Sequence, residues 1–210
     1  MRTKFNRNLI PWVMAAGRAM LGPVLILGAS CGWNGVALAS MVVAALLSDI
    51  FDGVLARRWR CDTAGVRLFD SMADTVFYAG AAIAVWVGRP QVWQRNATLL
   101  VILLGMEGVR AGFEFAKFGK PASYHSYVAK AWGLILAAAV VAAFVWPGAQ
   151  WLMPVALAMG ILTNAEGLMI SIMLPVWRHD VKTLKDARRL RRETMWVAAQ
   201  GEFGPVVFVR

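Results

Sequence analysis

The sequence predicts an all-α, polytopic membrane protein with six transmembrane helices and cytoplasmic N- and C-termini. Of the 210 residues, 59% are hydrophobic and 16% are charged, whereas a soluble domain is about 45–50% apolar and about 25% charged. The mean hydropathy is +0.57, and the long apolar runs lack the period-2 alternation of a membrane β-barrel. A bilayer is therefore the expected solvent for most of the chain.

Six apolar segments are each long enough to cross a hydrocarbon core of about 30 Å at about 1.5 Å per residue. They are residues 9–31, 35–56, 70–88, 97–116, 126–147 and 151–177. We therefore expect a transmembrane domain over residues 1–177 and a basic cytoplasmic tail over residues 178–210. The first segment is too long for a secretory signal and contains Arg18, which argues against its removal as a signal peptide.

The basic residues between these segments predict the orientation. The net charge is +10, and Lys and Arg cluster before the first segment, after the second, after the fourth and after the sixth. The opposite side carries Arg89 and Arg95 alone. The positive-inside rule then places both termini in the cytoplasm and the protein in the cell inner (plasma) membrane. Topology accounts for the positive charge, so we expect no nucleic-acid partner.

The tail from Trp177 to about Ala198 mixes basic and apolar residues, and we expect it to be helical. Two interpretations remain open for it. It lies along the anionic inner leaflet as an amphipathic helix, or it forms a plain solvated helix.

Four acidic residues lie at the cytoplasmic ends of the second and third segments: Asp49, Asp52, Asp70 and Asp74. Asp49 and Asp52 stand at i and i+3 of one helix, and Asp70 and Asp74 stand at i and i+4 of the next, so each pair shares a helix face. A short loop would bring the two faces together, and four converging carboxylates need a counter-charge. Oxygen ligands suit Mg²⁺ or Mn²⁺, and two such ions about 3.5–4 Å apart can hold a diphosphate during its displacement.

From Asp49 to Asp74 the sequence resembles the signature of the CDP-alcohol phosphatidyltransferase family. That signature reads D-x-x-D-G-x-x-A-R, then seven or eight residues, then G-x-x-x-D-x-x-x-D. The chain departs from it at one position, because the second glycine is expected at Val66 and Gly65 stands one place earlier. The departure affects the edge of the nucleotide pocket and leaves the aspartates in register.

The resemblance implies a reaction and the roles of the four aspartates. A phosphatidyl group would pass from a CDP-linked lipid such as CDP-diacylglycerol to the hydroxyl of a small alcohol, with release of CMP, in phospholipid biosynthesis. Asp49, Asp52, Asp70 and Asp74 would bind the metal ions, with two Mg²⁺ or Mn²⁺ expected. Asp74 would also act as the general base on the acceptor hydroxyl. The family likeness also implies a homodimer in the bilayer.

The resemblance assigns a second group of residues to the CDP moiety, alongside Asp49. Gly53 and Ala56 would let the cytidine nucleotide lie close to the helix, and Arg57 would contact the diphosphate. Arg18 falls in a P-x6-R-x4-P spacing found at the start of many family members. A basic residue within an apolar helix is expected to face a polar cavity, with snorkelling to the interface as the alternative.

Three residues are candidates for the acceptor site. Arg110 is either an acceptor-phosphate ligand or an ion-pair partner of Glu107 on its own helix. Lys130 matches a lysine of the G-K-x-K-T motif of phosphatidylglycerophosphate synthases, although the rest of that motif is missing. His125 is either a second acid/base group or an interfacial histidine. The acceptor alcohol stays open among glycerol 3-phosphate, inositol, inositol phosphate and serine.

A transporter is the alternative class of function. A divalent-cation or anion transporter could use the same aspartates as its pathway. Such proteins more often place ionisable residues near the bilayer midplane, between repeated halves. Here the acidic residues lie at one surface and no internal repeat is visible, so the enzyme is the favoured interpretation.

Overall fold

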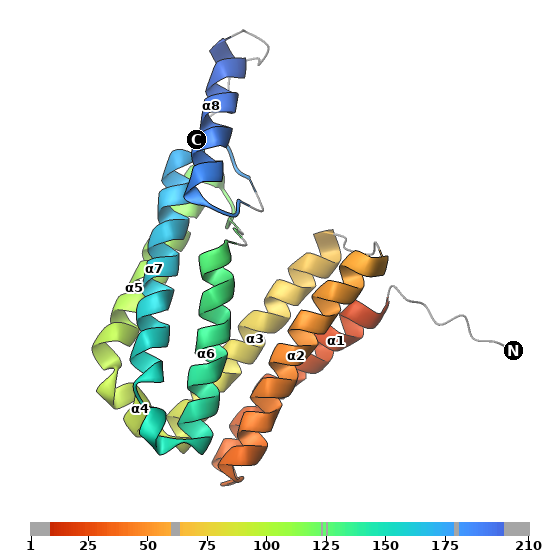
Figure 1. Cartoon of the computed structure of the whole chain (residues 1–210), viewed down its shortest axis with the longest axis vertical. Coiled ribbons are helices and arrows are strands. Elements are labelled where there is room, and N and C mark those ends of the chain that lie inside the picture. The colour runs from red at the N-terminus through yellow and green to blue at the C-terminus, as the bar shows by residue number, and fades with distance from the viewer. Residues whose placement is uncertain (1–8, 60–63, 123, 125, 179–180, 200–210) are drawn as a thin grey trace, which may run out of the picture. The chain divides into compact units, whose positions relative to one another are not determined.

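The computed structural model describes residues 9–59, 64–122, 124, 126–178 and 181–199, and these are helical apart from short connections (Figure 1). The elements are α1 (Ile10–Ser30), α2 (Gly35–Trp59), α3 (Ala64–Gly88), α4 (Pro90–Arg95), α5 (Ala97–Phe118), α6 (Tyr127–Val145), the 3₁₀ turn η2 (Pro147–Ala149), α7 (Leu152–Met173) and α8 (Leu184–Ala199). No strand occurs among the described residues, so the all-α prediction is confirmed. Each of the six predicted segments corresponds to one long helix, with the largest difference at α3, which begins at Ala64 rather than at residue 70.

Within the described part of the chain, five helices are long and apolar enough to cross a membrane. The candidate spans are Trp12–Ser30, Gly35–Leu55, Phe69–Gly88, Tyr127–Val145 and Leu152–Met173. The sixth predicted segment, α5, has 22 residues, but Glu107, Arg110 and Glu114 lie within its first 18 positions. Charged side chains in hydrocarbon are costly, so apolar character alone does not qualify α5 as a span. The chain is a membrane protein with five candidate spans by these criteria.

The chain divides into two compact units. The first comprises residues 1–96 and 136–153, and the second comprises residues 97–135 and 154–210. The first unit therefore contains α1 to α4 and the C-terminal part of α6. The second contains α5, the start of α6, most of α7 and α8.

A close crossing of α1 and α3 organises the first unit. A Cβ atom on Gly80 would lie 2.6 Å from the Cα of Gly22, and one on Gly22 would lie 2.8 Å from the carbonyl oxygen of Val76. Both distances are shorter than side-chain carbons tolerate, so the two backbones can approach this closely only because both residues are glycine.

The contacts on either side of this crossing show that α1 and α3 run in the same direction. The rings of Trp12 and Phe69 lie 4.9 Å apart near the start of both helices. Near their other end, a Cβ on Gly88 would meet the Cβ of Ala29 at 3.7 Å. Helix α2 packs against α1 and runs antiparallel to both helices, and all three contribute to the cytoplasm-facing end predicted from the sequence (Figure 1).

A tight turn between α1 and α2 makes this return possible. Gly32 adopts a φ of 70°, a left-handed conformation that favours glycine. Asn34 then caps α2, because its side-chain oxygen accepts a hydrogen bond of 2.7 Å from the backbone N–H of Ala37, at the third helical position.

In the second unit, α8 packs against a small apolar core. Its buried members come from the α5–α6 connection, the α7 region and the tail: Ala122, Tyr124, Ile170, Leu174, Val181 and Ala187. The tail helix begins at Leu184, later than the position near Trp177 predicted from the sequence. The reason is the cap Thr183, whose hydroxyl accepts the N–H of Asp186 at 3.1 Å and donates to its carboxylate at 2.9 Å, a reciprocal arrangement that starts a helix at the next residue.

The glycine crossing leads to a stability prediction. We expect Gly80→Ala to lower the free energy of unfolding by about 1–3 kcal/mol, as overpacked substitutions do, because the new methyl group would meet the backbone of Gly22. Thermal unfolding in detergent would measure it as a lower midpoint. Gly105→Ala in α5 is the matched control, because nothing lies within 4 Å of a Cβ there. Equal midpoints for the two variants would contradict the crossing.

Candidate active site

Four aspartates from α2 and α3 surround one arginine from α1. The Nη1 atom of Arg18 lies 2.7 Å from Oδ1 of Asp49 and 3.4 Å from Oδ2 of Asp52. Its Nε lies 2.9 Å from Oδ1 of Asp74, and its Nη2 pairs with Oδ1 of Asp70. The structure thus brings together all four acidic residues singled out in the sequence.

The cluster has a closed base and an open face. The side chain of Arg18 is 1% exposed and that of Asp52 is 5% exposed. In contrast, the side chains of Asp49, Asp70 and Asp74 are 43%, 35% and 34% exposed. A small ion or a polar group can therefore approach three of the carboxylates, while the guanidinium beneath them is shielded. Arg18 does not snorkel, because its head group ends in this cluster.

The residues present fit a divalent cation. One oxygen from each of Asp49, Asp70 and Asp74 lies within 4.8 Å of the others. With all groups ionised, four carboxylates and one guanidinium leave a net charge of −3. The Oδ2 atom of Asp52 is buried and accepts no hydrogen bond within the described part of the chain. Such an excess of carboxylate oxygens, one of them unsatisfied, suits a hard divalent cation, and Arg18 supplies only part of the required positive charge.

The residues predicted to contact the CDP moiety are described in part. Gly53 follows Asp52 directly on α2 and is half-buried. Ala56 and Arg57 continue the same helix, but their side chains lie outside the described part of the structure.

The displaced glycine of the family signature lies in the first turn of α3. A Cβ on Gly65 would meet only the ring of Trp12, at 3.8 Å, which is an ordinary contact. The structure of this unit therefore places no steric demand for glycine at position 65.

The acceptor candidates belong to the second unit. Arg110 donates from Nε to Glu114 at 3.0 Å, from Nη1 to Asn164 at 3.3 Å and from Nη2 to the carbonyl of Ala122 at 3.3 Å. The predicted pairing with Glu107 is wrong, because Glu114 is buried and needs the counter-charge, whereas Glu107 is exposed.

The structure gives fewer contacts for the other two acceptor candidates, Lys130 and His125. Lys130 is exposed on α6, and His125 lies outside the described residues. Neither residue therefore has a described contact that fixes its side chain in a site.

A buried polar network around Glu114 was missed by sequence reasoning. Ser171 donates to Glu114 at 3.0 Å and shares a hydrogen bond of 3.0 Å with the phenol of Tyr124. Because the one hydroxyl proton of Ser171 goes to Glu114, the phenol of Tyr124 is the donor to Ser171. The available signal was the spacing of Asn164, Gly167 and Ser171 in an apolar segment, at i, i+3 and i+7, which puts them on one helix face.

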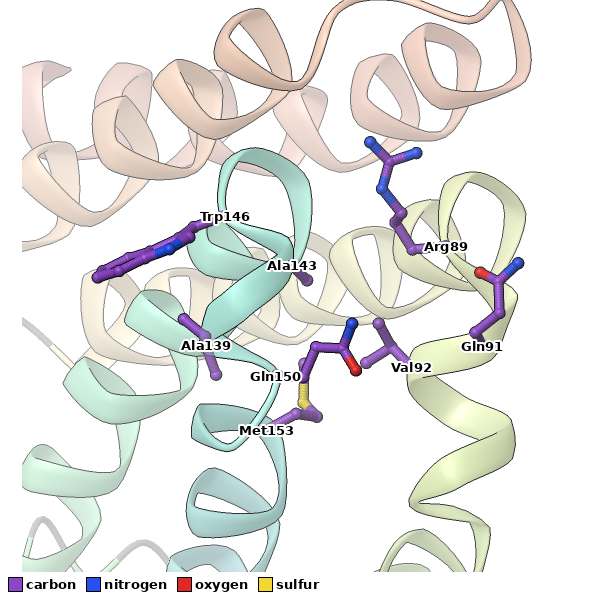
Figure 2. A pocket seen from close by; sticks show the side chains of 9 residues that line it. Arg89, Gln91, Val92, Ala139, Ala143, Trp146, Gln150 and Met153 are labelled. Atoms are coloured by element: carbon purple, nitrogen blue, oxygen red, sulfur yellow. The ribbon is translucent and has the colours of Figure 1, made fainter.

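Figure 2 shows a separate hollow in the first unit, around α4 and the turn after α6. Its lining includes Arg89 and Gln150, and no carboxylate lines it among the described residues. Arg89 directly follows α3, whereas Asp70 and Asp74 lie near the start of that helix. At about 1.5 Å per residue, the hollow and the acidic cluster are roughly 22–28 Å apart along α3, so they are different features.

Taken together, the spans and the acidic centre define a membrane protein with a carboxylate site for a divalent cation. Residues 8–162 match the family model described as CDP-alcohol phosphatidyltransferase, and the chain belongs to this family. It is therefore an enzyme that transfers a phosphatidyl group from a CDP-linked lipid to an alcohol in phospholipid synthesis. The resemblance identified from the sequence is confirmed.

Bacterial relatives support this assignment. Over 136 residues the chain is 31% identical to the CDP-diacylglycerol–glycerol-3-phosphate 3-phosphatidyltransferase of Escherichia coli strain K12, covering 59% of this chain and 75% of the relative. The protein of the same name from Shigella sonnei strain Ss046 matches to the same extent. No solved structure matches the chain.

The geometry of the cluster predicts a metal-dependent stability defect. In metal-free buffer, we expect Arg18→Gln to lower the free energy of unfolding by about 3–5 kcal/mol, the scale for removing one partner of a buried ion pair. Saturating Mn²⁺ should restore part of the loss, because the added cation replaces the missing charge. Thermal unfolding in detergent, with EDTA or Mn²⁺, would measure both effects.

Arg58→Gln is the matched control for this prediction, because Arg58 lies at the same end of α2 but is exposed. An Arg18→Gln midpoint that equals the control in EDTA would contradict the role of Arg18 as counter-cation.

Proposed function

We propose that Asp49, Asp52, Asp70 and Asp74 hold two Mg²⁺ or Mn²⁺ ions and that Asp74 is the general base of the phosphatidyl transfer. The observation that carries this proposal is the convergence of the four carboxylates on one buried guanidinium, with three of them open to a ligand. When bound, the ions would polarise the diphosphate and stabilise the charge that develops on the leaving group.

Asp74 suits the proton-accepting role for two reasons. Its carboxylate lies at the open face, and the contact of 2.9 Å between its Oδ1 and Nε of Arg18 orients it. Asp74 would take the proton of the acceptor hydroxyl as the hydroxyl oxygen attacks the phosphorus of the phosphatidyl group. The phosphoanhydride bond to CMP then breaks, and CMP leaves with the electron pair of that bond.

Arg18 has two tasks in this proposal. Without metal it offsets part of the electrostatic repulsion among the four carboxylates. From beneath the carboxylates, the charge of its buried guanidinium would also act on the CDP site, which we assign to Gly53, Ala56, Arg57 and Asp49. The small residues leave room beside the α2 backbone, and Arg57 supplies a charge for the diphosphate.

For the acceptor we place glycerol 3-phosphate first, because the names of the bacterial relatives specify it. Lys130, which is exposed on α6, and His125 are the proposed acceptor contacts, together with Arg110. Arg110 would keep its bond to Glu114 and use part of its guanidinium edge. The residues around Lys130 depart from the G-K-x-K-T pattern, so inositol, inositol phosphate and serine belong in the same test.

We further propose six spans, with α5 as the sixth and with both termini in the cytoplasm of the inner membrane. The contact of 3.0 Å between Arg110 and Glu114 supports α5 as a span, because an ion pair within the protein lowers the cost of two charges in hydrocarbon. The active site would then face the cytoplasm, residues 1–177 would form the membrane domain and residues 178–210 the tail. A homodimer is proposed from the family likeness alone. Family membership favours the enzyme over a cation or anion transporter.

The decisive assay is CMP release from CDP-diacylglycerol by the purified protein in detergent, with Mn²⁺ or Mg²⁺ and each acceptor in turn. We expect release that depends on metal and that one acceptor stimulates. Asp74→Asn should lower kcat by about 10²–10⁴-fold, the contribution of a general base. Glu193→Gln, an exposed acidic residue of α8, is the control and should keep wild-type activity.

Two results would overturn the proposal. One is the absence of CMP release with every acceptor in protein that still binds Mn²⁺. The other is an Asp74→Asn variant as active as the Glu193→Gln control, which would remove Asp74 from the proton transfer.

A further inference from the structure

The tail helix α8 carries a concentrated positive charge. Between residues 182 and 193 there are six basic and two acidic side chains, a net charge of +4. Neither the phosphatidyl transfer nor the acidic cluster uses these residues. The role of these basic side chains is therefore separate from the transfer reaction.

One face of α8 is fixed against the second unit. Ala187 is 0% exposed and Val181, just before the helix, is 1% exposed, and both belong to the core that contains Ile170 and Leu174 of the α7 region. Leu190, one turn after Ala187, packs against the same core. The helix is thus docked in one rotational setting and is not solvated on all sides.

The opposite face is basic. At about 100° per residue, Lys185, Arg189 and Arg192 point away from Ala187 and Arg188 lies at the side next to Arg189. All four are exposed. Of these four, Arg189 alone approaches a carboxylate within 4 Å among the described residues, at 3.9 Å from Asp186 and 3.7 Å from Glu193. The face therefore presents cations that the protein itself does not neutralise.

Large apolar side chains flank the C-terminal end of this basic face. Met195 is 58% exposed and Trp196 is 64% exposed. Tryptophan is enriched where a protein crosses from the head groups to the hydrocarbon of a bilayer. A basic face with exposed Trp and Met is the composition of a helix that lies in a membrane interface.

The docking contacts place α8 at the end of a membrane span. The candidate span of α7 ends at Met173, and α8 packs on Ile170 and Leu174 at that end. The connection also carries an aromatic residue next to a cation: the indole of Trp177 donates to the carbonyl of Pro121 at 3.1 Å, and Lys120 lies 3.7 Å above its ring. The part of α8 from Leu184 to Leu190, which carries most of the basic face, therefore lies beside the end of the α7 span.

We propose that the exposed face formed by Lys185, Arg188, Arg189 and Arg192 is a docking surface for anionic phospholipid head groups of the leaflet in which α7 ends. Phosphate groups complement these cations, and each basic side chain near an anionic membrane surface adds to the attraction. The tail would then hold anionic lipid beside the enzyme. This inference does not depend on the identity of the acceptor or on the catalytic role of Asp74.

The test is hydrogen–deuterium exchange of α8 in the full-length protein. The protein would be placed in nanodiscs of phosphatidylcholine alone or of phosphatidylcholine mixed with phosphatidylglycerol. We expect amide exchange in α8 to be about fivefold slower or more in the anionic discs, the scale of one basic side chain at an anionic surface. High salt should remove the difference, because screening weakens surface attraction.

Two variants separate charge from helix structure. Changing all four basic residues to Gln should abolish the difference between the two disc types, while an unchanged thermal midpoint shows that the protein remains folded. Replacing Arg188, Arg189 and Arg192 by Lys keeps the charge and should preserve most of the difference.

Three results would overturn the proposal. Exchange in α8 could be the same in both disc types, or the protection could persist in the folded Gln variant. An oligonucleotide could also protect α8 in phosphatidylcholine discs when anionic lipid does not, which would identify nucleic acid as the partner of this face.

Discussion

The ion pairs between Arg18 and the four aspartates are the interaction on which the first unit depends. Carboxylates packed this closely repel one another, and a single guanidinium at their base offsets only part of that repulsion. The residual negative charge keeps the open face attractive to cations. The same residues that make the bare cluster costly thus make it a site for divalent metal, so stability and function are coupled at this point.

The geometry of α1 and α3 is what allows these contacts. The backbones approach at Gly22 and Gly80, and Arg18 lies one turn before the crossing, opposite the turn of α3 that carries Asp70 and Asp74. A larger residue at either glycine would separate the helices and lengthen the ion pairs. The small residues of this crossing therefore act on the active site through helix spacing, although they do not contact a substrate.

In the second unit, unlike at the aspartate cluster, the buried charges neutralise each other. Arg110 and Glu114 satisfy each other inside a network that includes Asn164, Ser171 and Tyr124, so no net charge remains to attract a metal ion. In α8 the basic residues remain on an exposed face, where they can meet an external anion. The aspartate cluster, the Arg110–Glu114 network and the basic face of α8 thus follow one rule. A charged side chain that lacks an oppositely charged partner within the protein is exposed, where a ligand can neutralise it.

The sequence alone determined the helical class, the approximate helix ends and the family, because apolar runs and a long signature with four aspartates are local patterns. It also indicated that Asp49, Asp52, Asp70 and Asp74 share helix faces. Only the tertiary structure decided what those faces meet: Arg18 as the common partner, Glu114 rather than Glu107 beside Arg110, and Ala187 as the buried side of α8. Helical periodicity specifies which residues point the same way, whereas the choice of partner depends on packing between helices that are distant in the chain.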